Sequence, residues 1–246
     1  MSVVNIAAYR FVALEDLPRL QAQLLAAAEQ AQLKGTVLIA PEGINLFLAG
    51  SEAGIAAFVA VLEADARLAG LTLKRSLSAT QPFKKLLVKV KREIITLRQP
   101  QVNPALTPAP SVSPQTLKAW LDQGHDDAGR PLVLLDTRNT FEVEFGTFEG
   151  AVHPDLTKFS EYPEKLAALG SFEGTTVVTF CTGGIRCEKA APFMLQAGYQ
   201  NVVQLEGGIL NYFERCGSAH YQGGCFVFDE RVALDGDLQP SGATRS

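Results

Sequence analysis

The chain has 246 residues, of which 47% are hydrophobic, and it carries 22 Lys and Arg against 26 Asp and Glu for a formal net charge of −4. This length suits one large or two ordinary domains, each with its own core. No segment approaches the roughly 18 apolar residues of a membrane span, and the N-terminus lacks the basic and apolar regions of a secretion signal, so we expect a cytoplasmic protein without membrane attachment.

Strand and helix patterns alternate in the N-terminal third of the chain. Strands are predicted over residues 3–12, 35–40, 47–49 and 71–77, and amphipathic helices over residues 17–32 and 51–68. This β-α-β-β-α-β order is that of a ferredoxin-like α+β domain, which implies no function by itself. The segment PEGIN predicts a turn with a positive φ at Gly43, and a nucleotide-facing loop is the alternative.

The next segment, PFKKLLVKVKREI, is strongly basic. Lys85, Lys89 and Lys91 share one face of a predicted strand, and the opposite face is apolar, with Leu86, Val88 and Val90. Such a stripe is either a solvated strand face or a surface for a polyanion, of which nucleic acid is the commonest. The candidate phosphate contacts are Lys84, Lys85, Lys89, Lys91 and Arg92.

A proline-rich segment divides the chain. Five prolines fall within residues 99–114, which excludes a helix or a central strand there. Residues 1–110 carry 12 Lys and Arg against 8 Asp and Glu, and the remainder carries 10 against 18. We therefore predict a basic ferredoxin-like (acylphosphatase-like) domain over residues 1–98, a linker over 99–114, a second domain over 115–235 and a flexible tail over 236–246.

The stretch VVTFCTGGIRCEKA predicts a buried strand, a tight turn and a helix, with Cys181 at the end of the strand. Gly183 and Gly184 allow the backbone N–H groups of the turn to point inward beside a helix N-terminus, where they stabilise an anion. Together with Arg186 they favour a thiolate at Cys181, which indicates a nucleophile. A buried structural cysteine is the alternative.

The size of this loop is informative. The signature of cysteine-dependent phosphatases places arginine one position further on, where this chain has Cys187. The loop CTGGIR resembles the active-site loop of the rhodanese superfamily, whose members carry a cysteine persulfide. Two further segments, DTRNTFEVEFGTFEGA and QLEGGI, resemble rhodanese segments in the same order. The resemblance implies a cradle around the cysteine formed by Thr182, Gly183, Gly184, Ile185 and Arg186.

The whole chain, with APEGIN, PFKKLLVKVKREI, CTGGIRCEKA and CFVFDERVA in this order, is similar to the bacterial oxygen-dependent tRNA uridine hydroxylases that contain a rhodanese domain. The resemblance implies an α/β rhodanese domain, with a parallel sheet flanked by helices, after the ferredoxin-like domain. It also implies tRNA as partner, dioxygen as co-substrate, Cys181 as catalytic cysteine, and hydroxylation of the wobble uridine at C5. The alternative is a sulfurtransferase that passes persulfide sulfur to a small molecule or RNA, and a third possibility is an inert RNA-binding module.

Three further residues are candidates for supporting roles. Asp136 and Arg138 end a predicted strand beside the loop, where they either form an ion pair or contact substrate. Cys187 either exchanges sulfur or forms a disulfide with Cys181, or packs as a buried thiol. The histidines have no metal-ligand spacing, and Cys216 and Cys225 lack obvious partners for zinc, so we predict no metal site. The sequence shows no flavin or nucleotide fingerprint and identifies no metal or organic cofactor.

Overall fold

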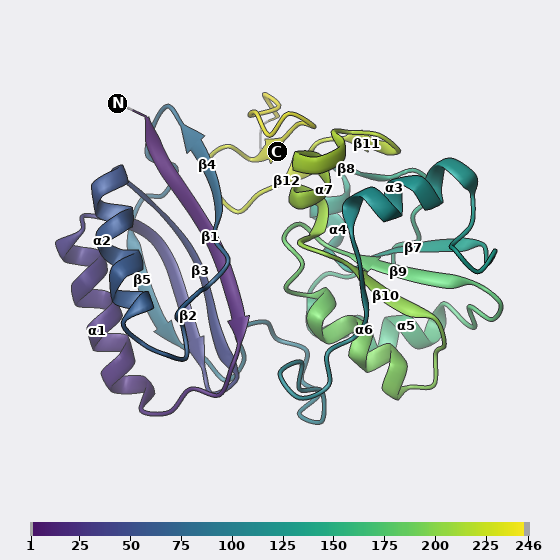
Figure 1. The fold of residues 1–246 in the computed structure, drawn as a ribbon, viewed down its shortest axis with the longest axis horizontal. Coiled ribbons are helices and arrows are strands. Elements are labelled where there is room, and N and C mark those ends of the chain that lie inside the picture. Colours follow the sequence, from purple (N-terminus) through teal and green to yellow (C-terminus); the bar gives the residue numbers. More distant parts are fainter. Residues whose placement is uncertain (1, 244–246) are drawn as a thin grey trace. The chain divides into compact units, whose positions relative to one another are not determined.

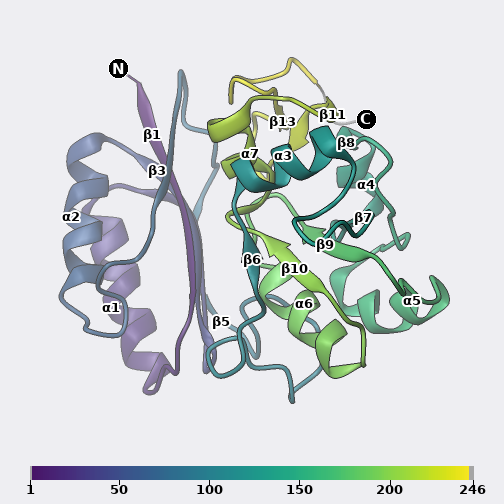
Figure 2. The same ribbon diagram turned by 45° about the vertical axis from the view of Figure 1, so that its right-hand side comes forward.

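The computed structural model describes residues 2–243 and consists of two compact units, Met1–Thr96 and Leu97–Ser246 (Figure 1). The first unit has five strands, β1 (Val3–Phe11), β2 (Lys34–Ala40), β3 (Gly43–Gly50), β4 (Lys74–Ser78) and β5 (Leu86–Val90), and two helices, α1 (Leu17–Gln30) and α2 (Glu52–Glu63). Both helices lie on one face of the sheet (Figures 1 and 2).

The strand order is β4-β1-β3-β2-β5. The pairs β4–β1, β1–β3 and β3–β2 are antiparallel. Strand β5 joins the edge of the sheet and is parallel to β2. The predicted ferredoxin-like arrangement is confirmed, with β5 as an additional strand. Buried positions recur at helical spacing in α1, at Leu20, Leu24 and Ala28, and pack with alternate residues of the strands in one core.

Several predicted boundaries in this unit are wrong. The helices end at Gln30 and Glu63, before residues 32 and 68, and β4 begins at Lys74 rather than at residue 71. The turn between β2 and β3 is also shorter than predicted, because β3 already begins at Gly43, at φ +150°. A Cβ atom at Gly43 would lie 2.0 Å from the Arg10 carbonyl oxygen, so this glycine permits the close pairing of β3 with β1.

The second unit contains a four-stranded parallel sheet of order β6-β10-β9-β7. Its elements are β6 (Ser111–Val112), α3 (Pro114–Gln123), β7 (Leu132–Asp136), α4 (Thr140–Val143), β8 (Gly146–Phe148), α5 (Tyr162–Ala168), β9 (Thr176–Phe180), α6 (Cys187–Gln196), β10 (Val202–Leu205), α7 (Gly208–Cys216), β11 (Tyr221–Gly223), β12 (Cys225–Phe226) and β13 (Ala233–Leu234). Helices α3 and α7 lie on one face of the sheet, and α5 and α6 on the other (Figure 2). The parallel sheet flanked by helices confirms the predicted fold.

The segments that flank this unit are partly structured. Ser111–Val112 fall within the predicted linker but pair with β10, so regular structure begins before residue 115. Within the predicted tail, Pro240 bridges to Leu234, and the Ser241 N–H donates to the Ala233 carbonyl. Residues 244–246 of that tail lie outside the described residues. No helix within residues 2–243 has both the length and the apolar character needed to cross a membrane.

Candidate active site

The predicted cysteine loop lies at the carboxyl end of the parallel sheet. Cys181 directly follows β9, and α6 begins at Cys187, so residues 181–186 form the whole connection. The sequence order of strand, turn and helix is therefore as predicted. In open parallel sheets this edge is where binding sites form, since the connecting loops converge there.

The surroundings of Cys181 favour its thiolate. The side chain is 2% exposed, and the Gly184 N–H donates to Sγ at an N to Sγ distance of 3.1 Å. Burial by itself raises the thiol pKa, but a hydrogen bond from Cys187, the charge of Arg186 and the backbone N–H groups of Arg186 and Gly184 outweigh it. The net effect lowers the pKa of Cys181 to about 6, so the thiolate predominates at neutral pH.

Arg186 is held in place by a carboxylate that the sequence did not single out. Its Nη2 lies 2.8 Å from Oε2 and 3.1 Å from Oε1 of Glu142, which is fully buried in α4. Glu142 Oε2 also accepts the backbone N–H of Asn139, so the segment NTFE has the Asn-x-x-Glu spacing of a capping box. That spacing was the available signal for Glu142. Arg186 Nη1 is buried and has no hydrogen-bond partner among residues 2–243.

Asp136 and Arg138 form an ion pair at 2.5 Å, and both side chains are fully buried. Arg138 also donates to the Gly146 carbonyl at 2.7 Å, and Asp136 accepts the Thr147 hydroxyl at 2.8 Å. These contacts connect the end of β7 to β8. The alternative of direct substrate contact has no support from this geometry, because neither side chain reaches solvent.

Cys187 is the first residue of α6 and is fully buried. Its thiol hydrogen-bonds to the Cys181 sulfur, and the Thr137 hydroxyl lies 3.7 Å from its Sγ. Burial, followed by the interaction with Cys181, raises the pKa of Cys187 well above its usual value. Cys187 therefore stays protonated and donates a hydrogen bond to the Cys181 thiolate.

The N-terminus of α7 closes the other side of the loop. The N–H groups of Ile209 and Leu210 donate to the carbonyls of Cys181 and Thr182 at 2.9 and 3.1 Å. Gly208 has φ +68°, and a Cβ atom there would lie 2.4 Å from the Cys181 carbonyl oxygen. The second glycine of QLEGGI is thus required by this close approach of two backbones.

Comparison with known proteins agrees with this geometry. Residues 3–94 match the model of the UPF0176 acylphosphatase like domain, and residues 113–215 match that of the Rhodanese-like domain. A tRNA uridine(34) hydroxylase of Cupriavidus necator is 58% identical over 98% of this chain and 86% of its own length. The chain belongs to the tRNA uridine(34) hydroxylase family.

Other members of the tRNA uridine(34) hydroxylase family are equally similar. The proteins of that name from Bordetella petrii and Variovorax paradoxus are 58% and 57% identical, over 98% and 99% of this chain and 96% and 93% of their own lengths. A solved rhodanese-related protein from Thermoplasma volcanium is 26% identical over 44% of this chain and 93% of that chain, with a TM-score of 0.35. The family assignment rests on the full-length relatives.

The five predicted phosphate contacts of this family member lie in Met1–Thr96, and Cys181 lies in Leu97–Ser246. Lys84, Lys85, Lys89, Lys91 and Arg92 are all exposed. Leu86 and Val88 of β5 pack toward the core as predicted, but Val90 does not, because it is 41% exposed at the end of an edge strand. The structure contains no group of three or more His, Cys, Asp or Glu within residues 2–243 that could hold a metal ion.

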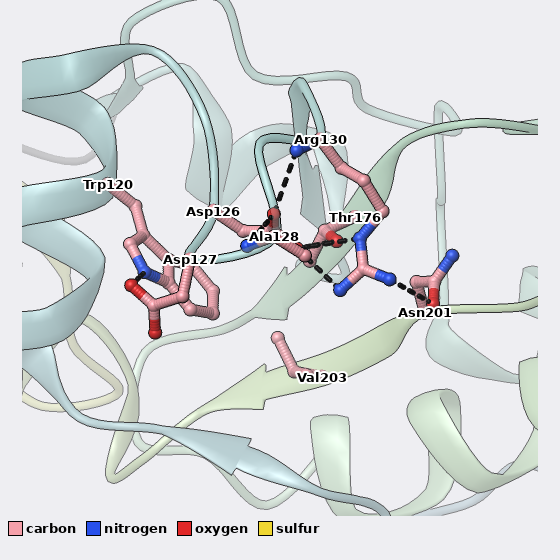
Figure 3. Close-up of a pocket in the computed structure, with 8 residues that line it drawn as sticks. All are labelled: Trp120, Asp126, Asp127, Ala128, Arg130, Thr176, Asn201 and Val203. Carbon is pink, nitrogen blue, oxygen red and sulfur yellow. Dashed lines mark hydrogen bonds and ion pairs between the residues drawn. The ribbon is translucent and has the colours of Figure 1, made fainter.

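A pocket of about 310 Å³ lies at the other end of the parallel sheet in this family member. Its lining includes Thr176, the first residue of β9, whereas Cys181 follows the last residue of that strand. Its polar side chains bond one another: Trp120 Nε1 donates to Asp127, and Arg130 contacts both Asp126 and Asn201 (Figure 3). These polar groups satisfy each other, so the pocket offers no unpaired polar side chain among those hydrogen bonds for a ligand.

Proposed function

We propose that this chain hydroxylates C5 of uridine 34, the wobble position of tRNA, with Cys181 as the catalytic cysteine and dioxygen as co-substrate. The observation that carries the proposal is the identity of 56–58% over 98% of the chain to proteins named tRNA uridine(34) hydroxylase. The reaction assigns the protein to the cytoplasm, where its tRNA substrate is found.

The geometry of the loop supports the role given to Cys181. A buried thiolate with a pKa of about 6 is present in its nucleophilic form at neutral pH. The sulfur is fixed by the Gly184 N–H, and its charge is balanced by Arg186. A serine in its place would be protonated at this pH and far less nucleophilic.

The stoichiometry sets a requirement on the assay. One oxygen atom of dioxygen enters the C5–H bond of uracil as a hydroxyl group, and the other is released as water. Reducing this second oxygen atom to water consumes two electrons and two protons. A small thiol such as dithiothreitol supplies them when it is oxidised to its disulfide. The assay therefore contains the full chain, unmodified tRNA transcript, dithiothreitol and dioxygen.

The test is an incubation under ¹⁸O-labelled dioxygen followed by mass spectrometry of the tRNA nucleosides. We expect one ¹⁸O atom in 5-hydroxyuridine at position 34, and no product from Cys181→Ser. Cys216→Ser is the matched control, because Cys216 lies at the end of α7, outside the loop, and this variant should retain activity. Metal analysis of the purified protein accompanies the assay, since a metal requirement would appear as loss of product with chelator.

Two results would contradict the proposal. Product formation by Cys181→Ser at the rate of the unaltered protein would remove the catalytic role of Cys181, and ¹⁸O entering from water would remove dioxygen as the oxygen donor. Rapid transfer of sulfur from thiosulfate to cyanide, with no hydroxylated tRNA, would instead identify a sulfurtransferase.

A further inference from the structure

A cluster of phenylalanines lies beside the Cys181 loop. Phe141 in α4 and Phe228 after β12 are 42% and 49% exposed, and Phe226, which is 2% exposed, lies against both. The ring centroids of Phe226 are 5.2 Å from Phe141 and 5.1 Å from Phe228, with edge-to-face angles of 86° and 89°. The buried ring thus holds two half-exposed rings in fixed orientations.

Three contacts fix this cluster to the catalytic loop. The Thr182 hydroxyl donates to the Phe226 carbonyl at 3.4 Å. The guanidinium carbon of Arg186 lies over the ring of Phe228, 5.9 Å from its centroid. Arg186 is in turn bound by Glu142, the residue that follows Phe141 in α4. The exposed rings are therefore neighbours of the residues that surround Cys181.

The exposure of these rings is informative because large apolar side chains are normally buried. Neighbouring residues in both segments are buried. Glu142 follows Phe141 and Val227 precedes Phe228, and both are enclosed, whereas the rings of Phe141 and Phe228 remain in contact with water. Half-exposed aromatic rings combined with an arginine are the usual means by which proteins hold an unpaired nucleobase, which stacks on the rings.

We propose that Phe141 and Phe228 form a stacking platform for the uracil base at position 34 of the RNA substrate. This inference rests on the proposed function, since it takes the modified base as its ligand. Position 34 lies in the anticodon loop, where the base is unpaired, and proteins recognise such loop bases by stacking them on aromatic side chains.

The test measures binding, which does not depend on hydroxylation. The full chain is titrated against a fluorescently labelled anticodon stem-loop RNA, and against the same RNA with an abasic nucleotide at position 34. Stacking on an aromatic ring contributes roughly 1–3 kcal/mol, so Phe228→Leu should weaken binding of the intact RNA by about 5- to 150-fold. Phe228→Trp should restore binding, and Phe141→Leu should act in the same direction.

The abasic RNA separates stacking from a structural effect. It should bind the unaltered protein more weakly, and Phe228→Leu should cause no further loss, because the partner of the ring is already missing. The control variant is Tyr199→Leu, at a half-buried aromatic residue between α6 and β10 at the far end of the sheet, and this variant should bind both RNAs normally. Alkylation of Cys181 at pH 7 monitors whether the loop is intact.

If Phe228→Leu weakened binding of the intact and the abasic RNA equally, the stacking proposal would be wrong, because the effect would not involve base 34. Unchanged binding of the intact RNA by the Phe141→Leu, Phe228→Leu double variant would overturn it as well. Failure of the proposed function is distinguishable: the chain would then form no hydroxylated product under labelled dioxygen, whereas its binding would still depend on Phe228 and on base 34.

Discussion

Cys181 and Cys187 are both buried cysteines, and their surroundings move their pKa values in opposite directions. The pKa of Cys181 falls because Arg186, Cys187 and backbone N–H groups together outweigh burial, whereas burial and the neighbouring Cys181 raise that of Cys187. Only one of the two is therefore a nucleophile at neutral pH, and the other stabilises it as a hydrogen-bond donor.

This difference predicts a pH profile for alkylation. The thiolate is the reactive form, so the rate at which iodoacetamide modifies Cys181 should rise with pH and reach half of its maximum near pH 6. Cys187→Ala removes a donor to the thiolate and should move the half-point to higher pH. Peptide mass spectrometry after short exposures between pH 4.5 and 9 measures both. A half-point near 8.5, the value of an unperturbed thiol, would contradict the assigned environment.

For individual residues, the sequence alone is sufficient to identify those that lie in one continuous loop. Cys181, Gly184 and Arg186 are recognisable because they are adjacent in the chain. Glu142 was not identified, because the segment NTFEVEF contains two glutamates and only the fold shows which one reaches Arg186. Phe228 was also missed, since a phenylalanine outside a predicted element gives no indication of its exposure.

Among the elements, β5 and the residues beside it are the predicted tRNA contact. Replacing Lys84, Lys85, Lys89 and Lys91 by glutamine should weaken binding of all tRNA sequences alike, because lysines at phosphates carry no base information. The slope of log affinity against log salt should fall by about 0.7–0.9 for each lysine that no longer neutralises a phosphate. Filter binding at several salt concentrations measures this, and alkylation of Cys181 should be unaffected.

The matched control for these lysines is Lys165→Gln, which removes a positive charge from α5 in the other unit. We expect it to leave the salt slope unchanged. A quadruple variant that is folded and binds tRNA with unaltered affinity and slope would identify the stripe as a solvated strand face.

Element types were more predictable than their limits. The type of each element, and hence the β-α-β-β-α-β order along the chain, follows from periodicity, because residues on the buried face recur with the period of a helix or a strand. The start of β3 cannot be predicted from periodicity. The sequence indicates a turn at Gly43, whereas in the structure this glycine allows the backbone to approach the Arg10 carbonyl closely. Likewise, Val90 alternates with the lysines in sequence, but its exposure depends on β5 being at the edge of the sheet.

For the molecule as a whole, the two units predict a specific pattern of limited proteolysis. Leu106 is 78% exposed and lies outside every helix and strand, between the two hydrophobic cores in the sequence. Exposed segments of this kind are cut first, so brief treatment with chymotrypsin should release fragments 1–106 and 107–246. Intact-mass spectrometry identifies them, and Leu106→Asp should suppress the cut. A first cut within β1–β5 or β7–β10 would contradict the proposed domain organisation.

The position of β5 has a consequence for the solubility of the protein. Without β5, the edge of the N-terminal sheet would be β2, whose N–H and C=O groups would be open to pairing with the sheet of another molecule. With β5 in place, the outermost strand is only five residues long, carries Lys89, and is followed by Lys91 and Arg92. Bringing two such edges together would place like charges side by side, so these lysines oppose aggregation through sheet extension whether or not RNA is bound.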